Sequence, residues 1–148
     1  MRRTGGSVTA VLVQVLGEPI PQGSMRALGR GRMTSDNDRL RPWRDSVAWH
    51  VRDAMRGRPP LGGPLEVRAT FVLPRPKSAP KKRWAPEKKP DLDKLLRATF
   101  DAATAGGLWV DDALVVAVTA RKVYSSPDVL PQLQLIAAHL ADPAAVPA

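Results

Sequence analysis

Two stretches of the chain carry apolar residues at the spacing of a helix that buries one face. The first follows a cluster of helix-capping residues at 34–38 and places apolar side chains at Leu40, Trp43, Val47, Val51, Ala54 and Met55. The second has the same spacing at Leu92, Leu95, Leu96, Thr99, Phe100 and Ala103. Gly57 ends the first stretch, and Gly106 with Gly107 ends the second. The pattern predicts two main helices.

Four other segments predict β-strands. Residues 65–73 alternate apolar and polar side chains, which is typical of a strand with one buried face. Residues 8–16, 115–123 and 130–136 are rich in Val, Leu and Ile. The resulting order, β-α-β-α-β-β, predicts a single α/β (α+β) domain with one mixed sheet. We expect the domain to span residues 1–141 and residues 142–148, with prolines among alanines, to form a frayed tail.

Positive charge dominates the composition, with 23 Lys and Arg against 14 Asp and Glu and a formal net charge of +9. This excess predicts an anionic partner, and a generally basic surface is the alternative. Most of the cations lie in loops that contain Pro and Gly, which favours nucleic acid over a membrane. No apolar run approaches the ~18 residues of a membrane span. The absence of cysteine fits a cytoplasmic protein.

The expected DNA contacts lie mainly in two basic loops. Residues 26–32 form a mobile loop in this interpretation, and residues 74–90 form a second one with Trp84 among its lysines. Trp84 can stack on an unpaired base, or alternatively pack on the domain. The candidate DNA-binding residues are Arg26, Arg30, Arg32, Lys81, Lys82, Arg83, Trp84, Lys88, Lys89, Lys94 and Lys122.

Acidic residues are scarce, yet Asp91, Asp93 and the pair Asp111-Asp112 flank the second helix. That helix is expected to be about 18 Å long, at ~1.5 Å per residue. Residues 106–112 reach roughly 23 Å when extended, so an antiparallel return is expected to bring Asp111 or Asp112 level with Asp91. Grouped carboxylates favour a hard divalent cation such as Mg²⁺. The alternatives are an N-cap at Asp91, an ion pair between Asp93 and Arg97, and a simple turn at residues 111–112.

Three motifs occur in this part of the chain: Lys89-Pro90-Asp91-Leu92-Asp93-Lys94-Leu95-Leu96-Arg97, Phe100-Asp101-Ala102, and Leu108-Trp109-Val110-Asp111-Asp112 with Val115-Val116. Together they resemble the RusA family of Holliday-junction resolvases. The similarity extends over most of the chain, from Val8 to Ala138. An Asp-x-Asp followed by a helix and an Asp-Asp at this distance is a fairly specific combination, whereas neither half is specific alone.

The resemblance implies a homodimeric endonuclease that uses Mg²⁺, with Mn²⁺ as the alternative ion. Such an enzyme resolves Holliday junctions by paired phosphodiester cleavage in recombination and repair, so its partners are branched DNA and a second copy of the chain, and no membrane. Asp91, Asp93 and Asp112 match the family's three catalytic, metal-binding aspartates. Lys94 stands where the family usually has Asn, and Arg97 stands where it has a functional Lys. We expect Arg97 to act in the active site as a phosphate clamp, because its guanidinium stays charged.

Two other functions stay open at this point. One is a metal-dependent nuclease that acts on other branched or single-stranded DNA. The other is a protein that binds DNA structures without cutting them. Cleavage of a synthetic junction in Mg²⁺ distinguishes all three.

Overall fold

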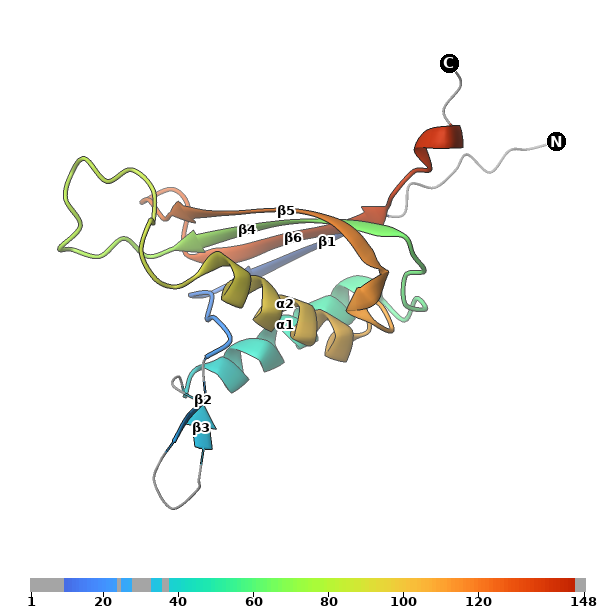
Figure 1. The fold of residues 1–148 in the computed structure, drawn as a ribbon, viewed down its shortest axis with the longest axis horizontal. Helices are drawn as coiled ribbons and strands as arrows, with labels where there is room; N and C mark the ends of the chain where they lie inside the picture. Colours follow the sequence, from blue (N-terminus) through green and yellow to red (C-terminus); the bar gives the residue numbers. More distant parts are fainter. Residues whose placement is uncertain (1–9, 24, 28–32, 36–37, 146–148) are drawn as a thin grey trace.

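The computed structural model describes residues 10–23, 25–27, 33–35 and 38–145. One layer is a four-stranded sheet, and two helices cover one of its faces (Figure 1). The strands of this sheet are β1 (Ala10–Leu16), β4 (Leu65–Leu73), β5 (Val115–Tyr124) and β6 (Gln132–His139). The helices are α1 (Leu40–Met55) and α2 (Leu92–Gly106). The predicted α/β fold with one mixed sheet and two main helices is therefore confirmed.

The strands follow the order β1-β6-β4-β5, so β5 lies at one edge of the sheet. β4 and β5 are parallel, whereas β6 is antiparallel to both of its neighbours. Parallel neighbours need a crossover connection, and α2 is that connection. α2 consequently runs back along the two strands, from the carboxyl end of β4 to the start of β5 (Figure 1).

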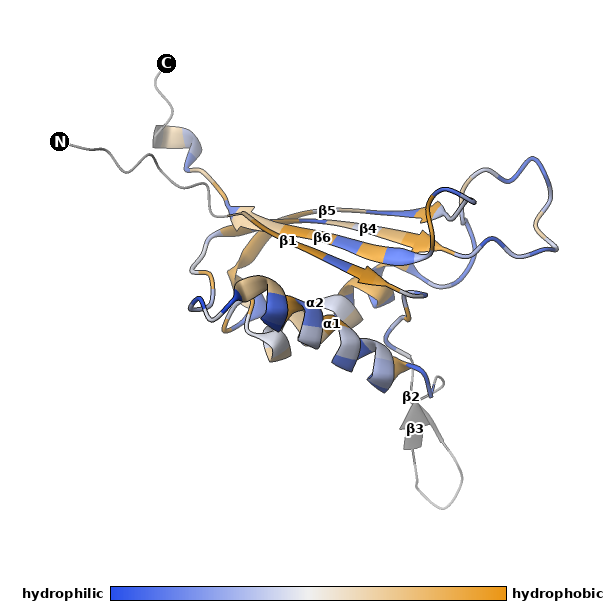
Figure 2. Ribbon diagram, turned by 180° about the vertical axis from the view of Figure 1, so that it is seen from behind, coloured by the Kyte–Doolittle hydropathy of each residue, from blue (hydrophilic) through white to orange (hydrophobic). Residues whose placement is uncertain are grey.

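The core lies between the sheet and the helices, where the predicted apolar stripes meet. Leu65, Val67 and Phe71 of β4 are buried on the face that the helices cover, as the alternation predicts. Apolar residues dominate the strands, while hydrophilic residues dominate the long loop between β4 and α2 (Figure 2). Trp109 closes the core beyond α2, where its Nε1 donates a hydrogen bond to Thr104 Oγ1 at 2.7 Å.

Two expectations about the start of α1 are wrong. The capping cluster at 34–38 does not cap the helix, because the N-cap position is Arg39 and its side chain makes no capping bond. Residues 26 and 27 do not belong to a loop, since β2 (Met25–Ala27) pairs antiparallel with β3 (Met33–Ser35), whereas residues 28–32 lie outside the described residues. Pairing uses the backbone of residues 34 and 35, which therefore cannot enter the helix. Arg26 lies in β2, and Arg30 and Arg32 fall outside the described residues.

The C-terminal segment contains a short helical turn. Two 3-10 helices are present in the described part of the chain: η1 (Asp112–Leu114), which precedes β5, and η2 (Pro143–Ala145). In η2 the Ala144 amide donates to Asp142 Oδ1 at 2.8 Å. Residues 146–148 lie outside the described residues, so the frayed tail from residue 142 stays a prediction. Within the described ranges, neither helix has the length and hydrophobicity to cross a bilayer.

The two helices approach closely where α2 ends. A Cβ atom on Gly106 would lie 2.6 Å from the Ala48 carbonyl oxygen and 2.8 Å from Val51 Cβ. Both neighbours belong to the buried face of α1, and one of them is backbone. Gly106 is therefore required by the contact between the helices, and this contact fixes how α2 lies on the sheet.

Replacing Gly106 with Ala tests this packing. Alanine usually stabilises a helix by ~0.5–1 kcal/mol relative to glycine, so a purely local effect would raise stability. We expect the opposite sign, a loss of about 1–3 kcal/mol, because the Cβ overpacks against the Ala48 backbone. Denaturant unfolding measures the change. Gly62→Ala is the matched control, since a Cβ there meets nothing within 4 Å; a Gly106→Ala protein as stable as the wild type would contradict the tight contact.

Candidate active site

Asp91 and Asp93 lie at the N-terminal end of α2, and both are exposed. Asp91 occupies the N-cap position with extended backbone (φ −71°, ψ 139°), but its side chain makes no capping hydrogen bond. Its Oδ2 instead lies 3.9 Å from Lys94 Nζ, one turn further along the helix. The positive end of the helix dipole stabilises negative charge here. The two carboxylates thus face solvent, where they can take up a cation.

Backbone hydrogen bonds hold this end of α2 on two sides. The Gln22 amide donates to the Lys94 carbonyl at 2.9 Å, which fixes the segment after β1 against the first turn. Lys122 Nζ, from β5, donates to the Lys88 and Pro90 carbonyls, both at 2.9 Å. The surroundings of Asp91 are therefore built from segments far apart in the sequence.

A hollow of about 380 Å³ opens beside Asp91. Its lining includes Glu18, Gln22 and Arg39 from the N-terminal part of the chain, and Lys89 and Lys94 next to Asp91. Glu18 and Arg39 form an exposed ion pair at 2.9 Å. Lysines and an arginine around a carboxylate match what a phosphodiester next to a metal ion needs. A polyanion can approach Asp91 from this side.

Asp112 does not lie near Asp91, contrary to the expectation. It begins η1 after the C-terminal end of α2, in a separate hollow that Arg44, Asp101 and Thr104 also line. α2 has 15 residues, and such a helix separates its ends by roughly 22 Å. The chain runs back along α2 only in β5, because β5 lies parallel to β4. Residues 106–112 do not make this return. Among the described residues, no group of three acidic or histidine side chains forms a metal site.

The structure does distinguish Asp111 from Asp112. Asp111 Oδ1 accepts a hydrogen bond from the Ala113 amide at 2.8 Å, so this side chain caps η1. Asp112 is exposed, and no hydrogen bond or ion pair within the described part of the chain occupies its carboxylate. Asp112 is therefore the carboxylate of the two that can serve a ligand.

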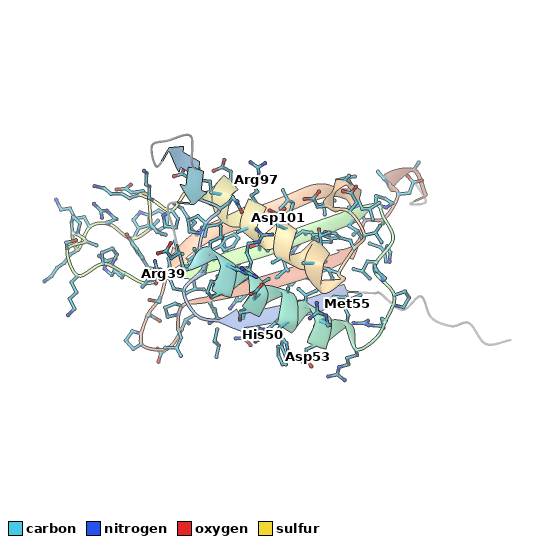
Figure 3. All side chains as sticks on the ribbon, turned by 90° about the horizontal axis from the view of Figure 1, so that it is seen from below. Arg39, His50, Asp53, Met55, Arg97 and Asp101 are labelled. Carbon is cyan, nitrogen blue, oxygen red and sulfur yellow. The ribbon has the colours of Figure 1, made fainter. Side chains whose placement is uncertain are left out.

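Arg97 is exposed on α2, one turn beyond Asp93 (Figure 3). Within the described ranges no ion pair joins Arg97 to Asp93 or Asp101, so the ion pair considered from the sequence is not formed. Asp101 instead approaches Arg44 of α1 at 4.0 Å. The guanidinium of Arg97 keeps its five donors for solvent or for an anion.

The side chain of Arg75 organises the loop of residues 74–90. Arg75 donates to the Pro80 and Arg83 carbonyls, both at 2.7 Å, and its guanidinium lies 4.9 Å from the ring centroid of Tyr124. These contacts fold the loop back on itself and attach it to the end of β5. The roles of Arg75 and Tyr124 were not predicted from the sequence. Tyr124 lies opposite Leu73, two residues before Arg75, only because β5 pairs in parallel with β4.

The candidate DNA contacts of this loop differ in exposure. Trp84 is 87% exposed, so the alternative in which it packs on the domain is wrong. Lys81, Lys82, Lys88 and Lys89 are also exposed. Arg83 is different, since its side chain is only 17% exposed and its Nε lies 3.5 Å from Glu87 Oε1. Arg83 therefore supports the loop, whereas the lysines and Trp84 are available to a partner.

Comparison with known proteins gives one consistent result. A family model described as endodeoxyribonuclease RusA matches residues 17–130, which include Asp91, Asp93, Asp111 and Asp112. Proteins named crossover junction endodeoxyribonuclease RusA from Escherichia coli strain K12, O1:K1 and O6:H1 are each 35% identical to this chain over 74 residues. That match covers 50% of this chain and 52% of each relative, so the chain spans about half the length of the curated relatives it matches.

Proposed function

Since the chain belongs to the RusA family of endodeoxyribonucleases, we propose that it resolves four-way DNA junctions by metal-dependent cleavage of phosphodiester bonds. The observation that carries the proposal is the exposed pair Asp91 and Asp93, which lies beside the basic loop 74–90 in a chain of net charge +9. A protein that only binds DNA gains nothing from carboxylates beside its phosphate contacts. A metal-dependent nuclease requires them.

Asp91 and Asp93 suit Mg²⁺, which is commonly bound by one or two carboxylates together with water and substrate phosphates. Mn²⁺ accepts the same oxygen ligands. When bound, such an ion polarises the phosphate and lowers the pKa of a coordinated water. The residues of the chain do the rest: lysines and Arg39 hold the DNA backbone near the carboxylates, and Arg97 clamps a phosphate with a charge that does not titrate.

The distance between Asp91 and Asp112 supports a homodimer. Asp112 lies at the far end of α2, so it can join the other two carboxylates only if it comes from a second copy of the chain. A two-fold axis near the middle of α2 achieves this twice, because it places the end of each helix beside the start of the other. The product is two equivalent sites, which matches the two strands cut in a four-way junction.

The β5 edge is the surface we propose for this contact. Among the described residues, β4 is the only neighbour of β5 in the sheet, so one side of a ten-residue strand leaves its backbone groups for pairing. Val116 and Val118 on this edge strand are 59% and 47% exposed. Antiparallel pairing of two β5 strands brings the start of one, next to Asp112, beside the end of the other. Lys122 lies near that end and reaches the carbonyl next to Asp91.

We expect Asp93→Asn to lower cleavage of a synthetic four-way junction in Mg²⁺ by about 100-fold or more, because a metal ligand is removed. Junction affinity should be equal or higher, since the amide no longer repels phosphate. Asp53→Asn on the exposed face of α1 controls for the loss of one negative charge. Linear duplex and single-stranded DNA in parallel reactions show whether the branch is required. Wild-type cleavage by Asp93→Asn would remove the metal-site proposal.

Mixing two inactive variants tests the shared site. Asp93→Asn and Asp112→Asn homodimers should each be inactive. A mixed dimer would keep one intact site, made from Asp91 and Asp93 of one copy and Asp112 of the other. We expect refolded equimolar mixtures to nick junctions on one strand, because random pairing makes about half of all dimers mixed and each mixed dimer keeps one intact site. If all three carboxylates came from one chain, both sites of the mixed dimer would be damaged and no nicking would return.

The salt dependence of DNA affinity tests whether Lys81 and Lys82 bind phosphates while Arg83 supports the loop. Each phosphate contact contributes about −0.9 to the log-log slope of affinity against salt. The double variant Lys81→Ala, Lys82→Ala should make the slope shallower by up to about 1.8, because each lysine that binds a phosphate contributes one such increment. Arg83→Ala should leave the slope nearly unchanged and instead raise chymotryptic cleavage after Trp84, because its ion pair with Glu87 supports the loop. The reverse pattern would show that Arg83 is the DNA contact and the lysines are solvated.

A further inference from the structure

Lys122 lies on the edge strand β5, yet its charged ammonium group bonds to backbone carbonyls of the same chain. Its Nζ donates to two backbone carbonyls, Lys88 and Pro90, both at 2.9 Å. A lysine ammonium has three donors, so two of them are used within the chain. Both acceptors lie in the last three residues before Asp91. A side chain expected from the sequence to contact DNA is thus bonded to the segment that leads into the acidic pair.

The position of Lys122 in the sheet explains its reach. It lies opposite Phe71 in the parallel pairing of β4 and β5, and Phe71 is fully buried under the helices. Residues opposite each other share a face of the sheet, so the Lys122 stem extends on the face that the helices cover. The side chain is accordingly half-buried, and it joins the sheet to the chain at the start of α2.

Apart from Lys122, the segment before Asp91 is held by the burial of Pro86 and by the ion pair between Glu87 and Arg83. Residues 84–91 contain no helix or strand, and Lys88 and Lys89 are exposed. Arg75 supports the preceding part of the loop through Pro80 and Arg83, and Gln22 supports the first turn of α2 through Lys94. Lys122 acts between these two contacts, at the residues on which the position of the Asp91 backbone depends.

We propose that Lys122 is a positioning residue: it fixes residues 88–90 against β5 and thereby sets where Asp91 lies relative to the sheet and to the β5 edge. This inference rests on the proposed function, in which Asp91 binds a metal ion. Lys122 acts through the backbone and touches neither the ion nor DNA. Its effect should therefore appear in metal affinity and in the order of residues 86–91, with little change in the chemical step.

Three variants test the proposal. Lys122→Met keeps the length of the side chain and removes its donors, whereas Lys122→Arg keeps both the charge and donors for two carbonyls. Arg121→Met is the matched control, because it removes the same charge from the next residue, which is exposed and points to the opposite face of β5. All are compared as full-length protein, with a thermal melt to confirm folding.

The first measurement needs no DNA or metal. Amide hydrogen exchange of Glu87, Lys88, Lys89 and Asp91 should be about tenfold faster in Lys122→Met, because two charge-assisted hydrogen bonds that hold this segment are removed. Lys122→Arg and Arg121→Met should exchange like the wild type. The second measurement is Mn²⁺ binding by electron paramagnetic resonance, in which Lys122→Met should bind about tenfold more weakly. In cleavage, the Mg²⁺ concentration at half-maximal rate should rise by a similar factor, while the rate in saturating Mg²⁺ changes little.

Wild-type exchange and Mn²⁺ affinity in Lys122→Met would overturn the proposal. So would a Lys122→Met protein that keeps normal exchange but loses junction affinity with a shallower salt slope, because that is the result of a direct phosphate contact. Failure of the wild-type protein to cut any branched DNA would count against the proposed function alone. The exchange and Mn²⁺ measurements would still decide the role of Lys122 in that case.

Discussion

Parallel pairing of β4 and β5 is the constraint on which the rest of this structure depends. Two parallel neighbours cannot be joined by a tight turn, so the chain must cross back over the sheet, and α2 is that crossover. The direction of α2 follows: its N-terminal end lies at the carboxyl ends of both strands, and its C-terminal end lies at the start of β5. The residues that lead into Asp91 consequently lie near Lys122 and Tyr124, while Asp112 is left at the opposite end of α2. Close packing of Gly106 against Ala48 keeps the helix in this direction.

The same constraint explains which parts of the fold follow from the sequence and which do not. Local patterns suffice for the two helices and for the strands of the four-stranded sheet, because burial of one face imposes a period of 3.6 or 2 on the residues concerned; β4 matches the prediction to the residue, and α2 ends at the predicted pair Gly106 and Gly107. The path of residues 106–112 has no such local signal. Their length is sufficient for Asp112 to reach Asp91, but it does not specify which way the chain runs. That direction is set by the pairing of β5 with a strand 50 residues earlier in the chain.

The candidate site shows the same limit. The Asp-x-Asp motif and the basic loop can be identified from residue types, since carboxylates bind cations and exposed lysines bind anions wherever they lie in a fold. What the individual cations do cannot be identified in this way. Arg75, Arg83 and Lys122 are as basic as Lys81 and Lys82, yet the first three bond to carbonyls or to Glu87 inside the protein, and the last two face solvent. The difference arises from partners distant in the sequence, such as the carbonyls that Lys122 reaches 32 and 34 residues away.

This division of the cations bears on how a strongly basic protein can keep an acidic pair in place. An excess of nine positive charges draws a polyanion to the whole surface, and that attraction alone does not select one phosphodiester for cleavage. Selection requires that a few carboxylates stay at a fixed distance from the cations that hold the phosphates. Arg75 and Lys122 meet this requirement by bonding the loop 74–90 to the end of β5, next to the start of α2. Under the proposed function, charge supplies affinity for DNA, whereas the backbone contacts of these two residues set where the carboxylates lie relative to the bound phosphates.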